Sequence, residues 1–461
     1  MYIQQIYTGC LAQAAYYIES EGEAAIIDPL RDIQAYLDIA TARNAKIKYI
    51  FETHFHADFV SGHIDIAKKT GAKIVYGPTA KASYDIIIGT DGEEFPLGNE
   101  KIQLIHTPGH TKESSCFLAK DATGKTYAIF SGDTLFVGDV GRVDLAANET
   151  LTTKDLANMM YDSVEKLKKL SDDVVVYPGH GAGSACGKNI GKETTTTIGE
   201  QRKNNYALQP MDRETFVNTM VSGLPTPPKY FFMDAKINRA GYEDDMDTLL
   251  GHNVKALSVD NFILEKESGA LILDTRMPME YAQGHVPESL NIGLNGDFAV
   301  WVGTIIDNVP LILVCDEGKE KESVLRLGRV GYDKVKGFLK GGVNAWKEAG
   351  LPVSSIHSIT AEEFAKQIEK GNAQPLDVRN DGEVANGMVK DAITIPLGKL
   401  AEKLNTLDKN AHYYVYCAGG YRSMIGSSIL EKNGFKNLTN VEGGINAIKK
   451  TNAPIEVPVI A

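Results

Sequence analysis

The stretch THFHAD at residues 53–58 follows an apolar run at 49–51 that is typical of a buried strand. In extended backbone, side chains two residues apart point to the same side. We therefore expect His54, His56 and Asp58 to converge after this strand. Imidazole and carboxylate groups are common metal ligands, so this stretch predicts a metal site at a strand end.

Three further motifs each place a candidate ligand beside a glycine and after a predicted strand. They are PGHT with His110, SGDT with Asp133 and PGHG with His180. Glycine lets the backbone turn sharply at these points. A lone histidine is most often a structural residue, whereas a cluster of His and Asp side chains is typical of a functional site. The four motifs together therefore predict one metal centre in an N-terminal domain of mixed α/β structure.

In this order, the motifs resemble those of the metallo-β-lactamase superfamily over about the first 200 residues. The resemblance implies a sandwich with αββα layers. Dinuclear members such as glyoxalase II read HxHxDH, and the final histidine helps to hold a second metal. Phe59 stands at that position here and cannot coordinate a metal. A two-metal hydrolase therefore loses support.

The persulfide dioxygenase branch of this superfamily, which uses a single metal, is more similar. It implies that one Fe(II) per chain is held by His54, His110 and Asp133. Two histidines and one carboxylate form a facial triad that leaves coordination positions open for O₂ and substrate. The remaining metal-capable side chains are then expected to orient the ligands or to take protons. They are His56, Asp58 and His180.

The similarity to the dioxygenase branch continues through GDVGRVD at residues 138–144. Arg142 in this stretch is a candidate for binding an anionic part of the substrate, because a guanidinium group pairs with carboxylate or phosphate through two parallel bonds. A structural ion pair of Arg142 with Asp139 or Asp144 is the alternative.

The cysteines are five in number and widely spaced, which favours a reducing compartment over a disulfide framework. Cys186 lies six residues after His180 in a glycine-rich loop. It is a candidate sulfur relay near the metal pocket, and a packed small side chain is the alternative. Cys10 and Cys116 have apolar neighbours and are predicted to belong to the core.

An internal repeat follows the proline-rich segment LPTPP and the acidic stretch after it. LDTR at 273–276 reappears as LDVR at 376–379, an offset of 103 residues. A predicted strand ending at Cys315 reappears ending at Cys417, an offset of 102 residues. Repeats of this kind indicate two copies of one small α/β domain. The predicted domains are residues 1–245, 255–352 and 357–458.

The second copy contains CAGGYR at 417–422, between a predicted strand and a predicted helix at 423–431. A glycine-containing loop at such a junction points backbone N–H groups inward, and these groups stabilise a thiolate or a persulfide. The pattern CxxGxR resembles the active loop of a rhodanese, and the similarity covers 357–458. It implies catalysis by Cys417 and Arg422 and substrate binding at Gly419 and Gly420.

The first copy reads CDEGKE at 315–320, so Glu320 stands where the second copy has Arg422. Three carboxylates around one thiol disfavour its anion and repel sulfite. We therefore expect residues 255–352 to form an inactive rhodanese-like domain that serves as a spacer or docking platform. The role of Cys315 is left open.

The formal net charge of -12 disfavours broad nucleic-acid binding, which needs basic patches. The first 20 residues lack the basic start and apolar run of a signal peptide, and no apolar stretch approaches the length of about 20 residues that a membrane span needs. We therefore expect a cytoplasmic enzyme without nucleic-acid or membrane partners.

The order of the three domains resembles bacterial fusions of persulfide dioxygenase and rhodanese that remove excess sulfide. The resemblance implies oxidation of a thiol persulfide by O₂ to sulfite, coupled to sulfur transfer that forms or uses thiosulfate. Glutathione and coenzyme A are candidate thiols, and a homo-oligomer is expected. The alternatives are a zinc thioester hydrolase like glyoxalase II and a persulfide carrier without oxygenase activity. The identity of the thiol and the direction of sulfur transfer are left open.

Overall fold

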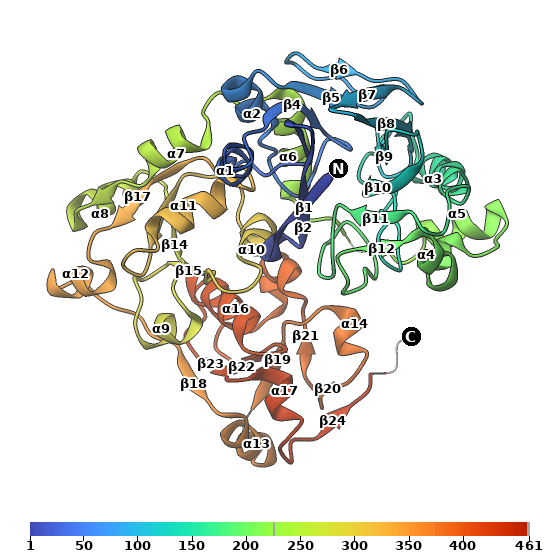
Figure 1. The fold of residues 1–461 in the computed structure, drawn as a ribbon. Helices are drawn as coiled ribbons and strands as arrows, with labels where there is room; N and C mark the ends of the chain where they lie inside the picture. Colours follow the sequence, from blue (N-terminus) through green and yellow to red (C-terminus); the bar gives the residue numbers. More distant parts are fainter. Residues whose placement is uncertain (225, 372, 459–461) are drawn as a thin grey trace. The chain divides into compact units, whose positions relative to one another are not determined.

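The computed structural model describes residues 1–224, 226–371 and 373–458 (Figure 1). Pro225, which belongs to the LPTPP segment, lies outside the described residues. The chain forms two compact units, and each unit is built from two separate stretches of the sequence. Unit 1 is Met1–Leu249 with Leu327–Gly331, and unit 2 is Leu250–Arg326 with Tyr332–Ala461.

Unit 1 contains two six-stranded sheets, ordered β1-β2-β3-β4-β5-β6 and β12-β11-β10-β9-β8-β7. The strands of the first sheet are β1 (Tyr2–Thr8), β2 (Gln13–Ser20), β3 (Glu23–Ile27), β4 (Lys46–Phe51), β5 (Lys73–Tyr76) and β6 (Ile87–Ile88). Those of the second are β7 (Glu94–Leu97), β8 (Glu100–His106), β9 (Ser115–Lys120), β10 (Thr126–Gly132), β11 (Val175–Pro178) and β12 (Thr196–Thr197).

Alternation along the strands divides the buried side chains of unit 1 between separate cores. In β9, Phe117 faces the core between the two sheets, whereas Cys116 and Leu118 face the helices behind the second sheet. The ring of Phe117 lies 4.8 Å from that of Phe51 in the first sheet. The sheets therefore pack face to face, and the predicted core position of Cys116 is confirmed.

Helices cover the outer face of each sheet (Figure 1). Helices α1 (Gln34–Ala42) and α2 (His63–Thr70) contribute Tyr36, Ala40 and Ile66 to the core behind the first sheet. Helices α3 (Thr153–Leu167), α4 (Ile198–Asn204) and α5 (Arg213–Val221) cover the second sheet. Thr152 caps α3 by accepting a hydrogen bond from the Asp155 amide at 3.1 Å. These layers confirm the predicted αββα sandwich.

Two segments hold the loop that carries the first metal motif. Helix α6 (Tyr230–Ala240) presents Asn238, which accepts a hydrogen bond from the Ser61 amide at 2.8 Å and donates to the carbonyl of His56 at 2.8 Å. In Leu327–Gly331, the Arg329 carbonyl accepts a hydrogen bond from the Val60 amide at 2.7 Å. Both sides of the loop are therefore fixed by residues distant in sequence.

The segment Leu327–Gly331 also forms polar contacts with the loop after β3. The guanidinium of Arg329 pairs with Asp32 at 2.6 Å, and the buried Arg31 donates to the Gly328 carbonyl at 3.2 Å. Buried donors need partners of this kind, because an unsatisfied one costs about 1 to 3 kcal/mol. Unit 1 is thus completed by five residues that come from the span of the first repeat.

Unit 2 contains two five-stranded parallel sheets with the same topology, β13-β17-β16-β14-β15 and β18-β23-β22-β19-β21. The first has β13 (Ala256–Leu257), β14 (Leu271–Asp274), β15 (Leu290–Asn291), β16 (Leu311–Val314) and β17 (Val335–Leu339). The second has β18 (His357–Ile359), β19 (Gln374–Asp377), β21 (Ile393–Thr394), β22 (Tyr413–Tyr416) and β23 (Leu438–Val441). The predicted internal repeat is confirmed.

The remaining elements follow the same duplication. The helices near and within the first repeat are α7 (Met246–Asn253), α8 (Val259–Glu267), α9 (Pro278–Gln283), α10 (Phe298–Ile305), α11 (Glu320–Gly328) and α12 (Gly342–Glu348). Those of the second are α13 (Ala361–Glu369), α14 (Asp381–Val384), α15 (Leu400–Lys403), α16 (Tyr421–Lys432) and α17 (Gly444–Ile448), with a small sheet of β20 (Met388–Val389) and β24 (Ile455–Glu456). Short 3-10 helices are Gly9–Leu11, Tyr206–Leu208, Leu397–Lys399 and Leu404–Thr406.

Polar contacts join the two repeats within unit 2. His285 pairs with Glu431 at 2.6 Å, and the Tyr421 hydroxyl donates to the Gly293 carbonyl at 2.7 Å. Among the described residues we find no helix with the length and apolar character that a bilayer span requires.

Candidate functional site

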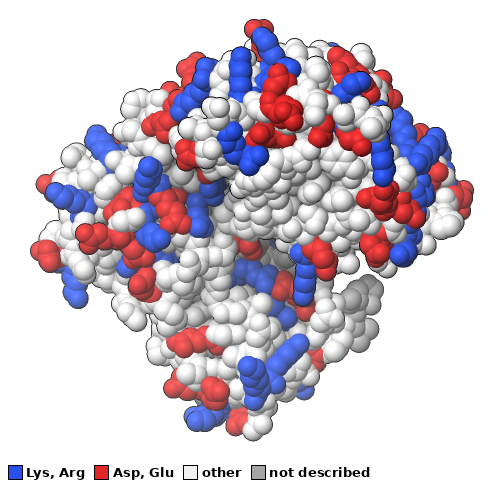
Figure 2. All heavy atoms as spheres, viewed as in Figure 1, with Lys and Arg blue, Asp and Glu red and all other residues white. Residues whose placement is uncertain are grey.

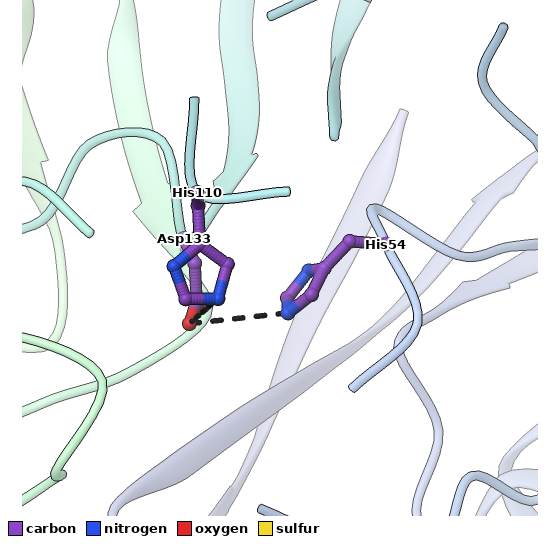
Figure 3. A group of neighbouring side chains, drawn as sticks. All are labelled: His54, His110 and Asp133. Atoms are coloured by element: carbon purple, nitrogen blue, oxygen red, sulfur yellow. Dashed lines mark ion pairs between the residues drawn. The ribbon is translucent and has the colours of Figure 1, made fainter. Parts of the chain in front are cut away.

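His54, His110 and Asp133 meet in unit 1, and Figure 3 shows both imidazole rings directed at the carboxylate. His54 lies in the loop after β4, His110 lies between β8 and β9, and Asp133 directly follows β10. The Asp133 Oδ2 atom lies 3.4 Å from His110 Nε2 and 4.0 Å from His54 Nε2. All three side chains are buried. The three sequence motifs are thus brought together in space.

Hydrogen bonds determine which nitrogen of each histidine faces the carboxylate. His110 Nδ1 lies 2.8 Å from the Arg142 carbonyl, which can only accept, so Nδ1 carries the proton and Nε2 is free. His54 Nδ1 lies 3.0 Å from the Thr53 hydroxyl, which itself donates to Asp28 at 2.9 Å. Burial and the neighbouring histidines hold the pKa of His54 well below its usual range. His54 is therefore neutral, as a metal ligand must be.

The donor set fits a divalent metal ion. Both carboxylate oxygens of Asp133 are buried and lack a hydrogen-bond partner among the described residues. A buried anion in that state needs a positive charge nearby. Two imidazole nitrogens and one carboxylate match the facial triad of non-heme Fe(II) sites. His54, His110 and Asp133 would hold such an ion.

The other two members of THFHAD stay near the first group, although strand alternation does not place them there. Strand β4 ends at Phe51, so residues 53–58 lie in a loop, and the rings of His54 and His56 have centroids 4.2 Å apart. His56 Nε2 faces Asp28 at 3.0 Å, and Asp58 faces His180 at 3.3 Å. Their proposed role in orienting ligands and moving protons stays a prediction.

A second group of donors, Asp58, His180 and Cys186, adjoins the first. His180 Nδ1 lies 3.1 Å from the Ala12 carbonyl, and its Nε2 lies 3.5 Å from Asp133 Oδ1. Burial and then Asp58 and Asp133 raise the pKa of Cys186 well above its usual range. The glycine-rich loop thus brings the Cys186 thiol beside the metal pocket, and its role as a sulfur relay stays a prediction.

A third buried group comprises Asp28, Glu52 and His56, of which the sequence indicated only the histidine. His63 also lies 3.2 Å from Glu52. Phe59 stacks on His56 with ring centroids 4.3 Å apart, so its apolar ring packs against that histidine. Asp28 and Glu52 each directly follow a strand, and that position was the available signal for both.

The guanidinium of Arg142 already has protein partners. It forms two contacts of 2.7 Å with Asp144, donates to the Ala185 carbonyl at 3.1 Å and is buried. This is the ion pair expected from the structural alternative. A pocket of about 60 Å³ opens beside His110, and Arg142 is not among the residues that line it. Substrate binding by Arg142 stays a prediction without support from this geometry.

In unit 2, Cys417 follows β22, and α16 begins at Tyr421. The Gly420 amide donates to the Cys417 sulfur at 3.1 Å, and this requires a φ of +106° that glycine adopts readily. A side chain at Gly419 would meet no atom within 4 Å, so the loop is open at that residue. The predicted strand, loop and helix are all present.

Arg422 lies one residue inside the same helix and pairs with Glu383 through contacts of 2.6 and 2.7 Å. The two parallel bonds fix the guanidinium group near the thiol. Glu383 was not predicted from the sequence, because it lies in α14, far from the CxxGxR pattern. The catalytic and binding roles of this loop stay predictions.

Comparison with known families agrees with both parts of the chain. The metallo-β-lactamase superfamily matches residues 8–180, and the rhodanese-like domain matches residues 258–349 and 360–451. The crystal structure of a metallo-β-lactamase from Staphylococcus aureus subsp. aureus COL is 32% identical, with a TM-score of 0.66. The match covers 73% of this chain and 98% of that one. The chain belongs to the metallo-β-lactamase superfamily.

Two other solved structures match parts of this superfamily member. ETHE1 from Myxococcus xanthus is 27% identical over 52% of this chain and 99% of its own, with a TM-score of 0.45. A rhodanese-related protein from Thermoplasma volcanium is 32% identical over 22% of this chain and 99% of its own, with a TM-score of 0.21. The family matches lie inside the predicted ranges 1–245, 255–352 and 357–458, whose exact boundaries stay predictions.

The first rhodanese-like domain of this superfamily member provides a poor environment for a thiolate. Glu320 is the first residue of α11, where the second domain has no acidic residue in the first turn. Burial, and then the charges of Asp274 and Glu320, raise the pKa of Cys315 to about 11. Hydrogen bonds with the hydroxyls of Ser323 and Thr275 lower the pKa, but they offset only part of this increase.

Cys315 should therefore react slowly with iodoacetamide in the folded protein. The thiolate is the nucleophile, and a pKa of about 11 leaves only about 0.1% of it at pH 8. The labelling rate should rise steeply toward pH 11, and Glu320→Gln should raise it at pH 8. Peptide mass spectrometry would measure both rates. Labelling of Cys315 at pH 8 as rapid as that of the partly exposed Cys10 would contradict the raised pKa.

Proposed function

We propose that this chain is a non-heme Fe(II) persulfide dioxygenase joined to a rhodanese sulfurtransferase. One observation carries the proposal: His54, His110 and Asp133 form a facial triad in a superfamily member that has Phe59 where dinuclear enzymes have a histidine. A triad of this type leaves positions for O₂ and substrate on one metal. The rhodanese-like domain with Cys417 supports chemistry on sulfur.

The proposed reaction converts R–S–SH, O₂ and H₂O into R–SH, SO₃²⁻ and two protons. The terminal sulfur is oxidised, O₂ is reduced, and the S–S bond breaks. The Fe(II) ion would supply O₂ activation at this site. Thr53 and the Arg142 carbonyl hold the two histidines with Nε2 free, and Asp133 contributes the negative charge. The buried setting of these groups keeps bulk water away from the reacting sulfur.

The second reaction moves one sulfur atom through Cys417. A persulfide on Cys417 and SO₃²⁻ would give the Cys417 thiolate and S₂O₃²⁻, and the reverse transfer would load Cys417 from thiosulfate. The Gly420 amide stabilises negative charge on the sulfur of Cys417. Glu383 positions the Arg422 guanidinium, which attracts the sulfite or thiosulfate anion. Sulfite made in one domain is therefore a substrate for the other.

Oxygen uptake by iron-loaded protein tests the proposal. Glutathione persulfide and coenzyme A persulfide would be supplied separately, and sulfite and thiosulfate would be measured. We expect rapid O₂ consumption with at least one of them, with sulfite or thiosulfate as product. Absence of uptake with iron confirmed in the protein would reject the dioxygenase. Hydrolysis of a thioester by the zinc form would then favour a hydrolase, and sulfur transfer alone would favour a persulfide carrier.

A further inference from the structure

The pocket beside His110 has a small interior and a mouth formed partly by α6. The pocket is open, and its inner part lies beside the ligand candidate His110. Its lining includes Phe55, Ala57 and Glu113 near the metal motifs. Phe232, which is 60% exposed, also lines it. A thiol persulfide that reaches His110 through this pocket would therefore pass the exposed residues of α6 at the mouth.

Arg239 is the cationic side chain at that mouth. It follows Asn238, which is bonded to the metal loop, so the backbone at Arg239 is fixed relative to the ligands. Its own carbonyl accepts a hydrogen bond from the Ser83 amide at 3.0 Å. The guanidinium lies 5.2 Å from the centre of the Phe55 ring, and this contact leaves its N–H groups free to bind a ligand.

The charges around the pocket favour one orientation of a ligand. Among the residues that the structure describes, no carboxylate forms an ion pair with Arg239, although this residue is exposed. Glu113, which is buried, accepts a hydrogen bond from the Phe55 amide at 3.3 Å and places a negative charge deeper in the pocket. A second carboxylate is disfavoured at that depth but is attracted to Arg239 at the mouth.

The net charge of the chain does not favour an anionic ligand. On the face shown in Figure 2, basic side chains are interspersed with acidic ones, and the chain has a formal net charge of -12. An anionic substrate is therefore not collected by a broad positive field, and a local cation must receive it. Arg239 meets that need at the entrance beside His110.

We propose that Arg239 selects low-molecular-weight thiol persulfides that carry an anionic group, by binding their carboxylate or phosphate while the persulfide end enters the pocket. This proposal rests on the dioxygenase function proposed above. It assigns to Arg239 the specificity role that the sequence suggested for Arg142, whose guanidinium is paired with Asp144. The two anionic groups differ in their source, since glutathione and cysteine carry carboxylates whereas coenzyme A carries phosphates.

The kinetic test compares Arg239→Gln with Lys236→Gln in the full-length, iron-loaded protein. Lys236 is an exposed cation on the same helix and does not line the pocket, so it is a matched control for the loss of one charge. For glutathione and coenzyme A persulfides, Arg239→Gln should raise KM about tenfold with kcat nearly unchanged. The persulfide of 2-mercaptoethanol, which has no anionic group besides the persulfide, should show little change. Whichever anionic persulfide shows the larger effect identifies the carboxylate or the phosphate as the bound group.

A binding measurement separates this proposal from the proposed reaction. Calorimetry with S-methylglutathione, which cannot react, should show about tenfold weaker binding to Arg239→Gln than to the parent protein, and no change for Lys236→Gln. For a ligand selected by phosphate, desulfo-coenzyme A is the corresponding probe. Arg239-dependent binding without O₂ uptake would reject the dioxygenase and retain the binding site. O₂ uptake with unchanged KM and binding in Arg239→Gln would reject the site and retain the dioxygenase.

Discussion

Asp133→Ala should abolish iron binding and reduce oxygen uptake by about a thousandfold or more, because it removes one of the three proposed ligands and the only carboxylate among them. Sulfur transfer from thiosulfate to a thiol should stay within about twofold of the parent rate, since Cys417 belongs to the other compact unit. Metal analysis, an oxygen electrode and a thiosulfate:thiol transfer assay would measure the three quantities.

Asp173→Ala provides the control for this change. Asp173 lies in the turn just before β11 of the same sheet, but its side chain is 61% exposed and pairs with Lys125 at the surface. The control should keep iron and both activities. If Asp133→Ala lost sulfur transfer as well as oxygen uptake, the two activities would not be separable, and the assignment of one to each unit would be wrong.

Cys417→Ser should reduce sulfur transfer by about a thousandfold, because a serine hydroxyl at neutral pH is a poor nucleophile and cannot carry a persulfide. Oxygen uptake on supplied persulfide should continue at the parent rate. The substitution is nearly isosteric, and the Gly420 amide keeps an acceptor at residue 417. The same oxygen electrode and transfer assay apply.

Cys315→Ser is the matched control, since it makes the same change in the other repeat. It should leave both activities intact, because the pKa of Cys315 is raised to about 11 and Glu320 begins the following helix. Full sulfur transfer by Cys417→Ser would show that Cys315 or Cys186 carries the sulfur. The first repeat would then be an active domain and the prediction of its inactivity would be wrong.

The sequence was sufficient to predict the fold because each part has a strong local signature. Four motifs resemble those of the metallo-β-lactamase superfamily, and that resemblance implied the sandwich of unit 1, whereas the offset between Cys315 and Cys417 indicated two copies of one domain. The structure has both features, with matching strand orders in the two repeats. Patterns of this kind can be recognised in a single sequence, because strand ends and repeated loops recur at fixed spacings.

The site was predictable only in part, because several of its contacts depend on side-chain direction and tertiary packing. His54 lies near His110 and Asp133, and His56 stays close to His54 with ring centroids 4.2 Å apart, but no sequence pattern indicated that His56 would pair with Asp28. Arg142 looked available in the sequence, and only the structure shows its pairing with Asp144.

Partners supplied by other elements could not be predicted at all. Glu383 reaches Arg422 across 39 positions of sequence, and no pattern links the two residues. Arg239 lies in a helix after the last of the metal-site motifs, and its place at the pocket depends on the bonds that Asn238 makes to the metal loop. Contacts of this type are created by tertiary structure.

The five residues Leu327–Gly331 give the first repeat a structural role that does not depend on the chemistry of its cysteine. A gene shortened to end at residue 249 would encode a unit 1 without the Arg329 carbonyl that Val60 bonds and the Gly328 carbonyl that Arg31 bonds. Such a truncated chain would leave these two buried donors without their carbonyl partners. The first repeat therefore contributes to the stability of unit 1 whether or not Cys315 handles sulfur.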